Sequence, residues 1–230
     1  MNWSKGETKY THPSVMKISA TMKARKVNNF KNWMDEARET GLIPRDYPAF
    51  NKDGDLAEYI AVVLGDGNIS RFDRTERLII SCNSKNTGFV NRYALLTKKI
   101  FKKDPTVSKV YNVNNIRISI YQKEISRRLG VPSGNRKDIV YKLPNWIKGS
   151  REFSIRFLRG LFEAEGSLSI HKPTSTYNFQ FCNKNDSLLR IVEGIIRSLG
   201  FNSEVRKIHV RLRRKAEVER FRELIRFRMY

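Results

Sequence analysis

Two stretches decide the architecture: YIAVVLGDG at residues 59–67 and LRGLFEAEG at residues 158–166. Each is an apolar run with small residues four positions apart, and each ends in an acidic residue followed by glycine. An anion at the C-terminus of a helix is unfavourable because the helix dipole is negative there. A chain that places Asp66 and Glu165 at such ends is therefore expected to hold positive charge there, and a divalent cation is the natural candidate.

The composition points to a polyanionic partner. The 230 residues include 45 Lys and Arg against 23 Asp and Glu, which gives a net charge of +22 and a pI near 10.2. This excess predicts nucleic-acid binding. No apolar stretch has the length of a membrane span, and the polar start of the chain has no signal-peptide core. Two cysteines are too few for a disulfide framework, so we expect an intracellular protein.

The segments after the two stretches repeat the same pattern. The sequences ISCNSKN at residues 80–86 and QFCNKND at residues 180–186 each lead into an amphipathic helix. Aligning these two segments makes Cys82 equivalent to Cys182, and both are expected to be small buried residues. An alternating strand follows in each copy, at residues 116–121 and 207–213, and a last helix closes it. The order helix–hairpin–helix–strands–helix, written twice, predicts an α+β duplication.

The repeat sets the expected domain boundaries. Residues 1–55 belong to neither copy and form an accessory segment, with one amphipathic helix from Met22 to Gly41 followed by a polar linker. The first repeat is expected over residues 56–142, the linker over 143–152 and the second repeat over 153–230. Whether the accessory segment braces the first repeat or extends the basic surface stays open.

Small residues on the two stretches predict close helix packing. Ala61 and Gly65 lie on one helix face, as do Gly160 and Ala164, and small residues allow two helix backbones to approach. Such packing would place the two acids side by side. The glycines that follow them, Gly67 and Gly166, are expected to be left-handed helix caps.

At these residues the chain resembles the LAGLIDADG homing endonucleases of the single-chain, two-motif type. The second stretch matches the motif at Leu158, Gly160, Leu161, Ala164 and Gly166, with Glu163 and Glu165 at its two Asp positions. The first stretch has Leu64 in place of the earlier Asp. The resemblance covers residues 56–230. It implies a pseudo-twofold duplicated fold in which two twisted antiparallel sheets form a saddle over DNA and the motif helices form the interface.

The resemblance also implies an activity and a cofactor. It implies a monomer that makes a staggered double-strand break in a long DNA target by metal-dependent hydrolysis of phosphodiester bonds. Mg²⁺ is the expected ion, with Mn²⁺ as a substitute and Ca²⁺ supporting binding without efficient cleavage. Asp66 and Glu165 would be catalytic and bind metal, together with the positions just before them, Gly65 and Ala164. Lys142 is the candidate auxiliary catalytic residue, and two nearby cations, Arg136 and Lys137, compete for that role.

Polar strand positions are the expected DNA contacts. Arg, Asn and Gln can pair bidentately with base edges, although about half of such residues contact only phosphates. The candidates are Arg71, Arg74, Arg77, Arg117, Ser119, Tyr121 and Lys123 in the first repeat and His171, Asn178, Gln180, Lys207, His209, Arg211 and Arg213 in the second.

Two other functions are compatible with the same fold. One is an RNA-binding maturase that helps an intron to splice, with intron RNA as its partner, and the other is a DNA-binding regulator that does not cleave. Retention of both motif acids favours cleavage over each of them. The chain has neither the first-residue nucleophile nor the terminal His-Asn of an intein, so an intron-encoded or free-standing enzyme is expected. The sequence has no phosphate-binding glycine loop, so we expect no nucleotide cofactor.

Overall fold

The computed structural model describes residues 6–26, 29–43 and 46–230, and the chain divides into two compact units, Met1–Tyr47 and Pro48–Tyr230. The first unit contains α1 (Pro13–Ala24) and α2 (Asn29–Glu39). The single helix expected from Met22 to Gly41 is therefore wrong. The backbone turns at Lys26, which has a φ of 52° in the left-handed region, and such a conformation interrupts a right-handed helix.

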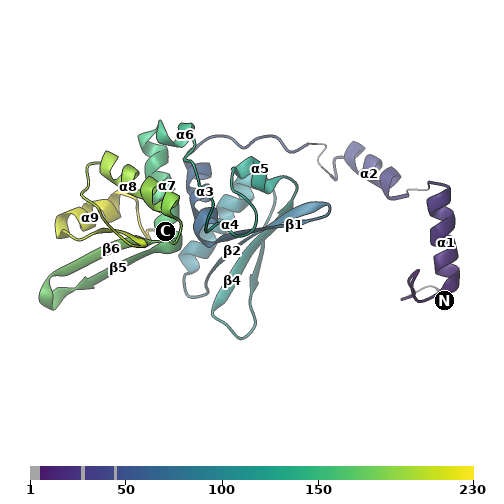
Figure 1. Ribbon diagram of the computed structural model, residues 1–230, viewed down its shortest axis with the longest axis horizontal. Coiled ribbons are helices and arrows are strands. Elements are labelled where there is room, and N and C mark those ends of the chain that lie inside the picture. Colours follow the sequence, from purple (N-terminus) through teal and green to yellow (C-terminus); the bar gives the residue numbers. More distant parts are fainter. Residues whose placement is uncertain (1–5, 27–28, 44–45) are drawn as a thin grey trace. The chain divides into compact units, whose positions relative to one another are not determined.

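The second unit contains the predicted order of elements twice, as Figure 1 shows. The first copy consists of α3 (Gly54–Asp66), β1 (Gly67–Phe72), β2 (Thr75–Asn83), α4 (Thr87–Phe101), β3 (Thr106–Lys109), β4 (Asn115–Gln122) and α5 (Ile125–Leu129). A short helix, α6 (Asn145–Lys148), lies in the connection. The second copy consists of α7 (Arg151–Glu165), β5 (Gly166–His171), the 3₁₀ turn η1 (Lys172–Thr174), β6 (Thr176–Cys182), α8 (Asp186–Ser198), β7 (Glu204–Arg206), β8 (His209–Leu212) and α9 (Lys215–Leu224).

The two sheets have the same antiparallel topology. Their strand orders are β1-β2-β4-β3 and β5-β6-β8-β7, which confirms the duplicated α+β fold. Asn86 and Asn185 begin α4 and α8 in the same way, since each side chain accepts a hydrogen bond from the backbone three residues on. Helix α7 begins two residues before the expected start of the second repeat because Ser150 caps it at the Phe153 amide.

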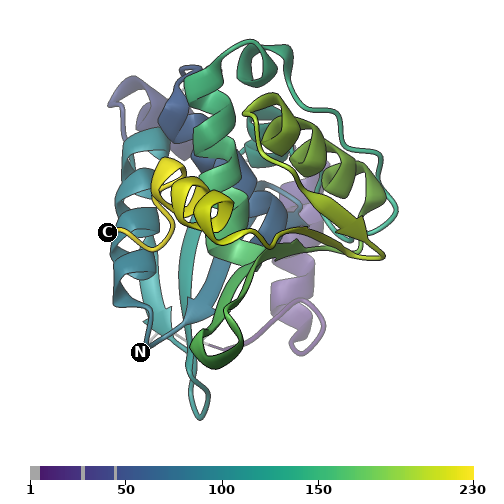
Figure 2. The same cartoon turned by 90° about the vertical axis from the view of Figure 1, so that its left-hand side faces the viewer.

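The core lies where helices cover one face of each sheet. Ile69, Leu78, Ile118 and Ile120 point from the first sheet into this core, and in the second sheet Phe179, Phe181, Val210 and Leu212 do the same. The alternation predicted for residues 207–213 holds only over β8, because Lys207 and Ile208 form the turn before it and Ile208 is exposed. Figure 2 shows α8 and α9 packed beside α7.

Helices α3 and α7 pack directly against each other at the centre of the second unit. A Cβ on Gly160 would clash with the Glu58 carbonyl oxygen and lie 2.7 Å from Cβ of Ala61. The two motif helices thus form the interface of the fold, and small residues lie where they approach. Buried side chains from both repeats form one continuous core around this pair.

The glycines after the two acids are not left-handed caps. Gly67 and Gly166 have extended backbones, with φ of −88° in both. Glycine is required at these positions because each begins a strand by folding back on its own helix. A Cβ on Gly67 would lie 2.6 Å from the Val63 carbonyl oxygen, and one on Gly166 would lie 2.9 Å from Cα of Phe162. These positions require glycine because there is no room for a Cβ, and not because φ is positive.

The two cysteines do not occupy equivalent positions. Gly67 pairs with Ile80 and Gly166 pairs with Phe181, so the residue equivalent to Cys182 is Ser81. The second hairpin has a longer turn, which includes η1, and this shifts the alignment of the two copies. A shift of one residue moves a side chain to the other face of a sheet. Cys82 therefore packs against the core, whereas Cys182 lies on the polar face with Gln180.

No helix in the described part of the chain is long and apolar enough to cross a membrane.

Candidate metal centre and nucleic-acid interface

Two carboxylates end the two central helices. Asp66 is the last residue of α3 and Glu165 is the last residue of α7. The helix ends are in contact, because a Cβ on Gly65 would lie 2.6 Å from Cβ of Ala164 and 3.1 Å from Cγ of Glu165. Both acids are partly buried. The arrangement inferred from the small residues, with the two acids side by side, is the one that the structure contains.

The electrostatics of the pair favour a bound cation. Burial raises the pKa of Asp66 to about 7, and repulsion by the Glu165 carboxylate adds to this rise. Burial also raises the pKa of Glu165. Two carboxylates that share a partly dehydrated place resist ionisation together unless a positive charge is added. The pair is therefore a candidate cation site.

The two carboxylates suit a metal ion whose remaining ligands are water and substrate. Within residues 6–26, 29–43 and 46–230, no three His, Cys, Asp or Glu side chains gather as a metal cluster. The two carboxylates, with the carbonyls of Gly65 and Ala164 next to them, would have to be completed by water and by a bound substrate. Mg²⁺ is commonly held in this way, by one or two carboxylates with substrate phosphates and water. The residues thus fit Mg²⁺.

The auxiliary cations occupy different surroundings. A cavity of about 490 Å³ lies beside Glu165, and its lining includes Leu64, Arg136, Lys137, Tyr141, Cys182 and Lys184. Lys142, the favoured candidate from the sequence, is an exposed residue next to this lining. Arg136 and Lys137, the competing candidates, both line the cavity. Position in space therefore favours Arg136 and Lys137 over Lys142.

Two residues that line this cavity each have a buried polar atom without a partner within the described residues. The two atoms are Nη1 of Arg136 and Oη of Tyr141. Buried donors in native structures are nearly always paired, so unpaired ones require an explanation. A ligand with acceptor oxygens that enters the cavity would provide one.

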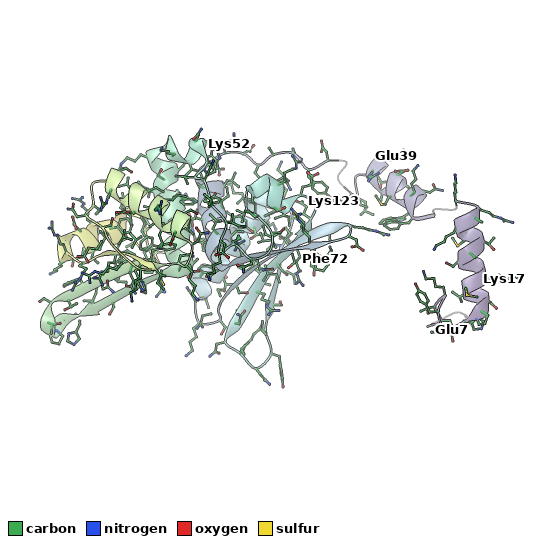
Figure 3. All side chains as sticks on the ribbon, in the orientation of Figure 1. Glu7, Lys17, Glu39, Lys52, Phe72 and Lys123 are labelled. Carbon is green, nitrogen blue, oxygen red and sulfur yellow. The ribbon has the colours of Figure 1, made fainter. Side chains whose placement is uncertain are left out.

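The first sheet presents one polar face. Residues of β4 and β2 pair across it, Tyr121 with Arg77 and Ser119 with Ile79. The guanidinium of Arg77 lies over the rings of Phe72 and Tyr121. Arg117 is exposed on the same face, next to Ser81. Figure 3 labels Phe72 at the end of β1 and Lys123 in the turn after β4.

Two of the candidates in this hairpin do not share that face. Arg71 pairs with Glu76, whose side chain is turned to the core face, and its Nε donates to the Glu76 carboxylate at 3.3 Å. Arg74 lies in the turn between β1 and β2. Arg71 lies opposite Glu76, which precedes Arg77 in β2, and successive residues of a strand face opposite sides of the sheet, so Arg71 and Arg77 lie on different faces.

The second sheet presents a matching polar face. Ser167 pairs with Gln180 and Gln180 with Arg211, so the three side chains form one row across the sheet. The next rows contain Asn178 beside Ser169, and His209 beside Cys182. Arg211 is held by Glu204 at 3.0 Å, and His171 contacts Thr174 at the hairpin turn. Lys207 and Arg213 are exposed at the two ends of β8.

A buried ionic network at the start of the motif helices was not foreseen. Glu58 has no exposed side-chain surface and accepts hydrogen bonds from Arg92 at 2.5 Å and from Arg156 at 2.6 Å. Arg159 lies 3.6 Å from the same carboxylate. Arg156 also pairs with Asp55. A charged residue inside an apolar run is the only sign of this network in the sequence.

The first acid of the second motif is not available to a metal. Glu163 is buried and accepts hydrogen bonds from the Arg228 amide at 2.6 Å and from the Tyr230 hydroxyl. The ring of Tyr230 lies against Gly88 of α4, so this segment of the second repeat contacts the first. Glu163 thus holds residues 228–230, whose Tyr230 ring packs on the first repeat.

The fold and its paired motif helices define a class, the proteins with a duplicated LAGLIDADG fold. Residues 152–226, within the second repeat, match the family model described as a LAGLIDADG-like domain. No curated protein matches the chain in sequence.

Solved structures show the same fold at low identity. The homing endonuclease I-DmoI is similar with a TM-score of 0.53 and 17% identity, over 75% of this chain and 94% of that one. The N-terminal LAGLIDADG domain of DUF199/WhiA gives a TM-score of 0.53 and 16% identity, over 78% and 86%. Full-length DUF199/WhiA from Thermatoga maritima gives 0.52 and 15%, over 78% and 57%. I-DmoI has been crystallised with DNA and Mn or Ca.

Proposed function

We propose that this protein is a site-specific homing endonuclease that makes a staggered double-strand break in a long DNA target by divalent-metal-dependent hydrolysis. The observation that carries the proposal is the contact between the ends of α3 and α7. It brings together Asp66 and Glu165, two partly buried carboxylates that have no hydrogen-bond or ion-pair partner among the described residues. A protein that used this fold only as a scaffold would gain nothing from two acids that repel each other.

The polar sheet faces support DNA as the substrate. On these faces Nε of Arg77, Oδ1 of Asn178 and Nδ1 of His209 are buried without partners within the described residues. Base edges offer the donors and acceptors that such groups need, and a two-stranded ribbon fits a major groove. The net charge of +22 favours the approach of a polyanion. Both halves of the site lie on one chain, so the protein acts as a monomer on an imperfectly palindromic target. Its place of action is inside the cell, on DNA.

The residues divide the work of the reaction between them. When bound, Mg²⁺ or Mn²⁺ supplies an activated water and neutralises charge on the scissile phosphate. Asp66 and Glu165 would each hold an ion, with the carbonyls of Gly65 and Ala164 beside them. Lys137 is the nearest candidate for binding a phosphate oxygen in the cavity, because the Arg136 guanidinium is bound to the carbonyls at the end of α3. The arginines of the sheets fix the register of the duplex.

A selection experiment tests the proposal. The native protein would be bound in Ca²⁺ to a randomised duplex library, and the retained DNA would be transferred to Mg²⁺ and sequenced after several rounds. We expect one long sequence to be recovered and to be cut in both strands. Recovery of a sequence that is bound and never cut in Mg²⁺ or Mn²⁺ would contradict the endonuclease and favour a DNA-binding regulator.

An RNA-binding maturase predicts a different outcome. In that case no duplex would be enriched, and a structured RNA library tested in parallel would give the selective binder. The two acids favour DNA cleavage, because RNA binding alone does not require them.

A further inference from the structure

Arg136 holds the end of one motif helix. It comes from the segment between α5 and α6, and its Nη2 donates to the Val63 carbonyl at 2.9 Å and to the Gly67 carbonyl. The Leu64 carbonyl lies 3.5 Å away. These three carbonyls flank Gly65 and Asp66, so a single guanidinium group binds the backbone on both sides of the acid.

This contact meets a specific electrostatic need. The last carbonyls of a helix have no partners inside the helix and form the negative end of its dipole. Asp66 adds a further negative charge at the same end. A guanidinium group stays charged at any ordinary pH and has several donors, so it satisfies the carbonyls and offsets the charge together.

The end of α7 is held in another way. There the Gly166 amide donates to the Phe162 carbonyl, and within the described residues no side chain donates to the carbonyls of the last turn. The Glu163 side chain is fixed instead by the Arg228 amide and the Tyr230 hydroxyl. The two halves of a pseudo-symmetric site are therefore braced by different groups.

We propose that Arg136 is a positioning residue for the Asp66 half of the site alone, so that its loss makes the two halves act unequally on the two DNA strands. The part that concerns DNA strands rests on the proposed function. The part that concerns the end of α3 rests on the hydrogen bonds to Val63, Leu64 and Gly67 and is testable without DNA or metal.

Hydrogen exchange in the metal-free protein tests the structural part. Arg136→Met keeps an apolar stem and removes the donors. We expect amide exchange in residues 63–67 to accelerate roughly tenfold, because hydrogen bonds to a charged group are lost, while residues 162–166 keep their native rate. Arg136→Lys should restore part of the protection. Equal acceleration at both helix ends would overturn the proposal.

Strand-resolved cleavage tests the functional part. A duplex selected as above, labelled differently on each strand, would be cut by the native protein, by Arg136→Met and by Phe101→Leu, a core variant of the same repeat chosen for a similar loss of melting temperature. We expect the ratio of the two strand rates to shift roughly tenfold only in Arg136→Met, because small misplacements of reactive groups have large effects on rate.

The possible outcomes separate the two proposals. If both strands slow equally in Arg136→Met, as in Phe101→Leu, Arg136 has only a general structural role and the inference fails. If the native protein cuts neither strand while hydrogen exchange changes only at the α3 end, the proposed function fails and the positioning of α3 by Arg136 is supported.

Discussion

At the scale of single residues, the two motif acids lower the stability of the metal-free protein at neutral pH. The pKa of Asp66 is raised from 3.8 to about 7 by burial and by Glu165. An acid whose folded-state pKa is raised stabilises the fold while it is protonated, and this contribution is lost as pH rises from 3.8 through about 7. Near neutral pH, Asp66 is therefore partly ionised and destabilising unless a cation is bound.

Replacing this acid should stabilise the metal-free protein. We expect Asp66→Asn to increase the free energy of unfolding at pH 8 by about 2 kcal/mol, less than the full linkage value because the carboxyl keeps some contact with solvent. The increase should shrink as pH falls below the raised pKa. Urea denaturation at pH 5 and pH 8 in chelator checks this, with the exposed acid Asp104→Asn as the control. A lower stability of Asp66→Asn at pH 8 would contradict the raised pKa.

The ionic network of Glu58 gives a second test at this scale. Glu58→Gln leaves Arg92, Arg156 and Arg159 without their shared buried carboxylate, and we expect a loss of about 3 kcal/mol in the free energy of unfolding. Glu124→Gln, which removes the partner of Arg127 at the surface, should cost under about 1 kcal/mol. Chemical denaturation of both variants makes the comparison, and similar losses would show that burial of Glu58 does not matter.

At the scale of elements, the sequence was sufficient for most of the fold. Two copies of one pattern give the order of helices and strands, because a face buried every second or every third to fourth residue is visible in the residues themselves. Features that depend on register were not predictable. Cys82 and Cys182 are not equivalent because a longer hairpin turn shifts the second copy by one residue. Arg71 and Arg77 lie on different faces because the pairing of β1 with β2 places Arg71 opposite Glu76.

Replacing glycine by alanine should have opposite effects on stability at the α3–α7 contact and at an open position in α8. Gly160→Ala places a Cβ against the Glu58 carbonyl and 2.7 Å from Ala61, so we expect it to destabilise the fold by about 2 kcal/mol. Gly194→Ala, in α8, places a Cβ in open space and should stabilise it by about 0.5–1 kcal/mol. Thermal melting of both variants checks the signs. A stabilising Gly160→Ala would contradict the close packing of the motif helices.

At the scale of the whole molecule, the site depends on contacts that the sequence does not reveal. The acids Asp66 and Glu165 could be found because each repeats at a helix end. The role of Arg136 could not, since its contacts with α3 join residues about seventy positions apart. The segment that holds Glu163 links the repeats through a tyrosine packed on Gly88, and nothing in the local pattern predicts that contact.

The charge of the whole molecule predicts the salt dependence of DNA binding. With a net charge of +22 and polar sheet faces rich in arginine, the protein should neutralise many phosphates. We expect the affinity for a selected duplex to fall by about a thousandfold between about 50 and 200 mM salt, as counterion release requires. Fluorescence anisotropy over this range measures it, and tight binding that does not change with salt would contradict the electrostatic account.

The central claim is that Asp66 and Glu165 each hold metal for hydrolysis, one in each half of the site. The most direct measurement is single-turnover cleavage of the selected duplex in Mg²⁺ by the native protein, Asp66→Asn, Glu165→Gln and the control Asp104→Asn. The account predicts a double-strand break by the native and control proteins and its loss in both motif variants, with DNA binding in Ca²⁺ retained. A double-strand break that persists in either motif variant would contradict it.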